Sequence, residues 1–147
     1  MQLTTHFSLE ELTLSSYAQR KGLPNDPQPG VIENLKITAA GMEVVRTILG
    51  DAPIHVDSGY RSPLVNAAIG GAKNSAHLTG YACDFICPAF GTPYQVANAI
   101  AHAVPPLRFD QLILEYGWVH ISFAPTFRMA LLTKKSAEAP YEEGLLA

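Results

Sequence analysis

The sequence is poor in the features that define several large protein classes. Its 147 residues include two cysteines and 16% charged residues, with a net charge of −3 and scattered basic residues. This distribution lacks the basic stripe that nucleic-acid binding requires. No apolar stretch approaches the roughly 18 to 20 residues that span a bilayer as a helix. We therefore expect no nucleic-acid partner and no membrane span.

The remaining composition is typical of a single globular domain. Apolar residues make up 48% of the chain, and the length is sufficient to bury a sizeable core. We expect one domain over residues 1–147, with a C-terminal strand or extension over about residues 125–147. We expect it to be a monomer.

The cysteines and the N-terminus indicate a compartment. If residues 82–87 form a strand, Cys83 and Cys87 lie about 13 Å apart, whereas a disulfide needs Cα atoms within about 7 Å. Both are therefore interpreted as free thiols in a reducing compartment. The N-terminal "MQLTTHFSLEEL" lacks the basic segment and apolar run of a secretory signal. We expect synthesis in the cytoplasm without a signal peptide.

Local patterns predict an α+β fold, with a small, mainly antiparallel sheet and helices packed on one side. Helices are expected to open at "FSLEEL", with Ser8 as the N-cap, and to cover residues 31–49, 63–69 and 93–102. Strands are expected to end at residues 58–59 and to cover 81–86, 109–115 and 118–123. The polar tail is expected to fray.

A tight turn at residues 116–117 determines which side chains of the last two strands point the same way. A two-residue loop pairs Ile113 with His120, and facing residues share one side of a sheet. The opposite side is then purely apolar and forms the core: Leu112, Leu114, Val119, Ile121 and Phe123. Glu115 and His120 point into a cleft, roughly 7 to 8 Å apart by Cα. This separation leaves space for a metal ion on His120 and a water beside Glu115.

His77 and Asp84 of "SAHLTGYACDF" combine with His120 into a set of three potential metal ligands. Zinc binds imidazole nitrogen and carboxylate oxygen, and a catalytic site keeps its fourth position open for water. Spacing alone leaves simpler interpretations open. His77 and Asp84 could form an ordinary hydrogen-bonded pair, Glu115 could be a solvated charge, and Trp118 could belong to the core.

Three segments resemble, in order, the motifs of one family of zinc peptidases: "SGYRS" (58–62), "SAHLTGYACD" (75–84) and "WVHIS" (118–122). This family contains D-alanyl-D-alanine carboxypeptidases and dipeptidases, together with phage endolysins that cut cell-wall peptides. The chain resembles its branch of small, single-domain, endolysin-like members over nearly the whole length. The resemblance implies a fold like that of hedgehog proteins and D-Ala-D-Ala peptidases.

The resemblance also implies roles for individual residues. His77, Asp84 and His120 match the zinc ligands of the family. Arg61 matches an arginine that steadies the substrate and the developing oxyanion, a role that suits a planar guanidinium. The alternative for Arg61 is a salt bridge that fixes its loop. Ser75 matches a serine that shapes the loop or touches the substrate.

One departure from the family pattern concerns the catalytic carboxylate. Several relatives place it three residues before the last histidine, where this chain has Gly117. The nearby carboxylate is Glu115, and the hairpin places it on the cleft side, so Glu115 is assigned as the general base. Trp118 stands where other relatives have a histidine, and we expect it to form a wall of the substrate pocket.

The implied reaction is zinc-assisted hydrolysis of a peptidoglycan stem peptide, with D-alanyl-D-alanine as the favoured substrate. In this reaction Glu115 moves the proton, while Arg61 and zinc stabilise the oxyanion. The alternatives are an L-Ala-D-Glu endopeptidase and a non-catalytic zinc module with a structural or wall-binding role. Because murein lies outside the cytoplasm, the lack of a signal predicts a phage or prophage protein that reaches the cell wall by another route.

Overall fold

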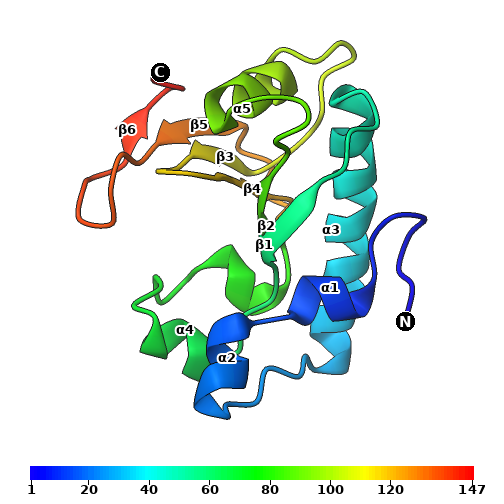
Figure 1. The fold of residues 1–147 in the computed structure, drawn as a ribbon, viewed down its shortest axis with the longest axis vertical. Helices are drawn as coiled ribbons and strands as arrows, with labels where there is room; N and C mark the ends of the chain where they lie inside the picture. The colour runs from blue at the N-terminus through cyan, green and yellow to red at the C-terminus, as the bar shows by residue number, and fades with distance from the viewer.

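A six-stranded sheet organises the chain, and the computed structural model describes all residues 1–147 (Figure 1). The strand order is β1-β2-β4-β3-β5-β6. The strands are β1 (His55–Ser58), β2 (Ala82–Ile86), β3 (Gln111–Leu114), β4 (Val119–Ser122), β5 (Ala130–Thr133) and β6 (Glu142–Glu143). Neighbouring strands are antiparallel except β3 and β5, which run parallel. The α+β prediction with a mainly antiparallel sheet is confirmed.

The chain also contains five α-helices and one 3-10 helix. They are α1 (Leu9–Thr13), α2 (Ser16–Lys21), α3 (Pro29–Ile48), α4 (Pro63–Ala68), η1 (Ala76–Thr79) and α5 (Pro93–Ala101). The predicted N-cap of α1 is present, since Ser8 Oγ accepts a hydrogen bond from the Glu11 backbone N–H. Helix α2 was not among the expected elements, because Ala18 is its one buried residue and it has no apolar periodicity. None of the helices combines the length and apolar character needed to cross a membrane.

The core lies between the sheet and the long helix α3, which runs beside it in Figure 1 together with α5. Leu35 and Met42 of α3 pack in one cluster with Ile100 of α5 and with alternate residues of β2, β3 and β4. Cys83 and Cys87 are buried there as free thiols, as expected. Helices α2 and α4 group below the ends of β1 and β2 (Figure 1). The side of the central strands that faces away from this core carries residues that line a cleft, among them Asp84, Ile113 and His120.

The β3–β4 hairpin has the predicted register. Ile113 pairs with His120, and the Glu115 N–H donates to the Trp118 carbonyl at 3.0 Å. Gly117 has a φ of +129°, a conformation that a residue with a side chain rarely adopts. Glu115 and His120 thus share one side of the sheet, while the apolar residues of β4 face the core.

The C-terminal segment contains the expected additional strand, β5, but the polar tail after it forms β6 instead of fraying. Strand β5 pairs with β3, and β6 folds back to pair with β5. The Thr133 hydroxyl donates to the Gly144 carbonyl at 2.8 Å and accepts from the Leu146 N–H at 2.9 Å. The sequence hides this arrangement because β6 has two residues, too few for an alternating pattern. The segment becomes a hairpin beside the cleft.

Candidate metal centre

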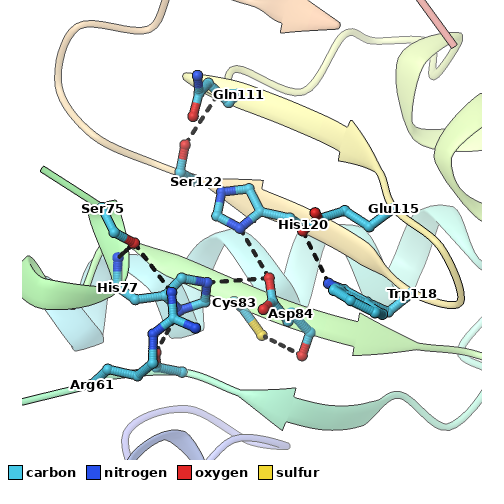
Figure 2. A network of polar contacts seen from close by, with 11 residues as sticks. Arg61, Ser75, His77, Cys83, Asp84, Gln111, Glu115, Trp118, His120 and Ser122 are labelled. Atoms are coloured by element: carbon cyan, nitrogen blue, oxygen red, sulfur yellow. Dashed lines mark hydrogen bonds and ion pairs between the residues drawn. The ribbon is translucent and has the colours of Figure 1, made fainter. Parts of the chain in front are cut away.

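Three side chains from separate elements meet on the open side of the sheet. His77 lies on η1, Asp84 on β2 and His120 on β4, and the register places Asp84 directly opposite His120. Asp84 Oδ1 is 3.2 Å from His77 Nε2 and 2.9 Å from His120 Nδ1. Figure 2 shows both imidazoles pointing toward this carboxylate. All three residues are buried, and their ligand atoms lie within 4.8 Å of one another.

This geometry fits a divalent metal ion. Donor atoms that bind one tetrahedral ion at about 2.0–2.2 Å lie roughly 3.3–3.6 Å from each other, close to the separations around Asp84. His77 Nδ1 also lies 2.6 Å from the Gly59 carbonyl, so both ring nitrogens of this histidine face oxygen acceptors. A neutral imidazole donates one hydrogen. With that hydrogen on Nδ1, the Nε2 lone pair faces the carboxylate, as a metal ligand requires.

Asp84 is ionised in this setting. Burial alone would raise the pKa of Asp84, but in the metal-free protein the positive charges of His77 and His120 and their hydrogen bonds outweigh burial and lower it well below its usual range. A divalent ion would take the place of these charges when both rings are neutral ligands. A metal ligand of this type has to be deprotonated. The carboxylate is therefore available as a ligand at neutral pH.

Gly59 contacts both His77 and helix α1: its carbonyl lies 2.6 Å from His77 Nδ1, and its Cα packs against the backbone of Leu12. A Cβ atom at Gly59 would overlap the Leu12 backbone carbonyl, which the Tyr60 N–H holds in a 2.8 Å hydrogen bond. We expect Gly59→Ala to lower the free energy of unfolding by about 1–3 kcal/mol in urea titrations. The matched control is Gly30→Ala in α3, where an added Cβ meets nothing within 4 Å, and stability should be unchanged or higher. Equal effects at both positions would contradict this role of Gly59.

Glu115 lies beside the three ligands without belonging to them. It follows β3 directly, and its Oε2 accepts a hydrogen bond from Trp118 Nε1 at 3.1 Å (Figure 2). Burial raises the pKa of Glu115 and the charge of Asp84 adds to this, against smaller opposing effects of His120, the Trp118 hydrogen bond and Lys134. A half-buried carboxylate with a raised pKa next to a metal site has the properties of a general base.

Trp118 lines the cleft, where sequence reasoning placed it. Its ring also packs edge-on against Tyr116, with centroids 4.5 Å apart. The hydrogen bond from its indole to Glu115 is an additional feature that spacing alone did not reveal. This bond holds the carboxylate in one orientation.

Arg61 and Ser75 form the opposite wall. Ser75 Oγ accepts the His77 backbone N–H at 3.2 Å and a hydrogen bond from the Arg61 guanidinium at 3.3 Å. Arg61 belongs to no ion pair, so a loop-fixing salt bridge is absent. Its Nε is buried without a partner. Burial lowers the pKa of Arg61, and the negative charges of Asp84 and Glu115 oppose that shift. The cleft thus contains a guanidinium available to a ligand.

The three candidate ligands share one cleft of about 870 Å³ with Arg61, Ser75, Glu115, Tyr116 and Trp118. The cleft also includes residues that sequence reasoning missed: Asp110, Gln111, Arg128, Lys134, Ala137 and Tyr141. Arg128 is held by Asp110 through bonds of 2.8 and 2.9 Å. A signal for Lys134 existed in the alternation of "LLTK", which puts it on the same side as Leu132, but the position of that strand was unknown.

Comparison with known proteins identifies a family for this chain. Residues 5–122 match the model of a family described as Peptidase M15. The chain is also similar to a zinc D-Ala-D-Ala carboxypeptidase of Streptomyces albus G, with 41% identity over 80 residues. That match covers 54% of this chain and 29% of the relative, so it spans less than a third of the relative's length. The family match includes every predicted site residue and ends at the last residue of β4.

Proposed function

Because the chain belongs to the peptidase M15 family, we propose that it is a zinc-dependent peptidase that hydrolyses peptidoglycan stem peptides, as a D-alanyl-D-alanine carboxypeptidase. The observation that supports this most is the convergence of His77, Asp84 and His120, with Glu115 beside them. Family membership confirms the resemblance in the motifs. The endolysin-like branch stays a prediction. The proposed substrate places the action of the protein at the cell wall.

Zinc is the ion that this donor set and the similar carboxypeptidase both support. We propose that His77 Nε2, Asp84 Oδ1 and His120 Nδ1 hold it. When bound, zinc polarises the scissile carbonyl and lowers the pKa of water in its open position to near 7. The Gly59 carbonyl keeps the His77 ring in the tautomer that this role needs.

The protein's own groups then perform the proton transfers. Glu115 removes a proton from the attacking water and passes it to the leaving amine, while the Trp118 indole keeps the carboxylate oriented. Arg61, held by Ser75, donates hydrogen bonds to the oxyanion that develops on the scissile carbonyl. These donors are in place before the reaction, which is the condition for effective stabilisation of developing charge.

Purified muropeptides and mass spectrometry of the products test the proposal. Loss of one terminal alanine from a pentapeptide stem is the expected result. Cleavage between L-Ala and D-Glu, the first two residues of the stem, would identify an L-Ala-D-Glu endopeptidase instead. A protein that cleaves no muropeptide but sediments with purified sacculi would be a wall-binding zinc module and would contradict peptidase activity.

The pH profile provides a separate prediction for Glu115. The base has to be ionised, so activity is present above its pKa and is lost as the pH falls through it. Because burial raises the pKa of Glu115 in the free protein, we expect the acid limb of kcat/KM to lie above the ordinary value of 4.5. Zinc content measured at each pH separates this effect from metal loss. An acid limb at or below 4.5 with zinc retained would contradict the assignment.

A further inference from the structure

The C-terminal hairpin of β5 and β6 adds two polar side chains to the cleft, Lys134 and Tyr141. Both lie outside residues 5–122, the range of the family match. The Lys134 N–H donates to the Leu114 carbonyl at 2.9 Å, which extends the parallel pairing of β5 with β3 by one residue. Lys134 is thus the neighbour of Glu115 on the cleft side of the sheet.

The ammonium group of Lys134 is fixed but not neutralised. Its Nζ donates to the Ala139 carbonyl at 2.7 Å and lies 4.8 Å from the centroid of the Tyr141 ring. No carboxylate lies within ion-pair distance of it, Glu115 included. By contrast, Lys135 pairs with Glu142 at 3.7 Å and does not line the cleft. Lys134 therefore supplies the cleft with a positive charge that forms no ion pair.

Tyr141 supplies a neutral donor next to this charge. Burial raises the pKa of Tyr141, and the charges of Glu115 and Asp84 add to the shift, so the phenol stays protonated. Its ring packs against Lys134, and its side chain lines the same cleft. An ammonium and a phenol that face one space are complementary to a carboxylate.

We propose that Lys134 and Tyr141 bind the free carboxylate of the residue that hydrolysis releases. This inference rests on the proposed function. Glu115 passes its proton to the leaving nitrogen, and in a C-terminal residue the carboxylate carbon is two bonds from that nitrogen. Neighbouring strands lie about 4.8 Å apart, so a cation beside Glu115 is within reach of this carboxylate.

Arg61, another cationic side chain of the cleft, lies near a different part of the substrate. The Arg61 guanidinium donates a hydrogen bond to Ser75, the N-cap residue of η1. Figure 2 shows Arg61 on the His77 side of the three ligands, away from Glu115. It is therefore suited to the scissile carbonyl rather than to the leaving residue.

Steady-state kinetics on an acylated D-Ala-D-Ala dipeptide and on its C-terminal amide test the inference. We expect the wild type to prefer the acid. Lys134→Met should raise KM for the acid roughly 10- to 100-fold, with a much smaller change for the amide, because a hydrogen-bonded charge is lost. Tyr141→Phe should raise that KM by a smaller factor, and Lys134→Arg should restore most of the preference. Lys135→Met is the matched control and should behave like wild type.

Equal losses for acid and amide, or a fall in kcat with unchanged KM, would overturn the carboxylate site. If the wild type cleaves neither compound, the proposed function fails, and binding then decides the inference separately. Calorimetric titration of both compounds into Glu115→Gln protein should show tighter binding of the acid, and the added Lys134→Met change should remove that difference. Equal affinity for acid and amide before that change would overturn the site.

Discussion

Glu115→Gln is expected to lower kcat for stem-peptide hydrolysis by about 10²- to 10⁴-fold, the usual contribution of a positioned acid–base group. The amide keeps the size of the side chain and still accepts the hydrogen bond of Trp118, so the cleft keeps its shape. Zinc should remain bound, because Glu115 is not among the three grouped ligands. Product chromatography and elemental analysis of the same sample measure both quantities.

The matched control for this change is Glu33→Gln. The Glu33 side chain is 68% exposed and pairs with Lys36 on the surface of α3, so its neutralisation should leave kcat unchanged. Full activity of E115Q protein would exclude Glu115 as the base. Loss of zinc from that protein would instead make Glu115 a ligand and would require a different base.

His120→Ala is expected to abolish both zinc binding and hydrolysis. When the free ion concentration is a hundred times its Kd, an ion that binds only the folded state stabilises that state by about 2.7 kcal/mol. For a chain of this length, this corresponds to a rise in Tm of roughly 5–10 °C. Zinc should therefore raise the Tm of wild type by this amount and leave the Tm of H120A protein unchanged. Thermal denaturation with chelator and with zinc measures the difference.

His55→Ala is the matched control, because the His55 side chain is 71% exposed and lies outside the cleft. It should show the same zinc-dependent rise in Tm as wild type. A zinc-dependent rise that survives in H120A protein but disappears in H55A protein would place the ion elsewhere.

The hairpin could be predicted from the sequence because its determinants are local. A two-residue turn with Gly117 fixes the register of β3 and β4, and the register fixes which side Glu115 and His120 occupy. The apolar alternation of the same strands identifies the core side. The candidate base and one candidate ligand therefore followed from pairing rules within about ten residues.

The rest of the cleft depends on contacts between distant segments, which no local pattern specifies. Arg61 reaches Ser75 only because the segment after β1 hydrogen-bonds η1, where the Arg61 N–H donates to the His77 carbonyl at 3.1 Å. Lys134 lies beside Glu115 only because β5 runs parallel to β3. Parallel pairing has no short turn that would predict its register. A tail with polar composition and a two-residue strand resembles an unstructured end until its partner strand is known.

X-ray absorption at the zinc edge of the loaded protein tests the central claim most directly, because it identifies the atoms bound to the ion. We expect two imidazole nitrogens and oxygen ligands, no sulfur, and no bound zinc in dialysed His77→Ala or His120→Ala protein. Sulfur ligands, which would implicate Cys83 or Cys87, or a zinc spectrum that both substitutions leave unchanged, would contradict this claim.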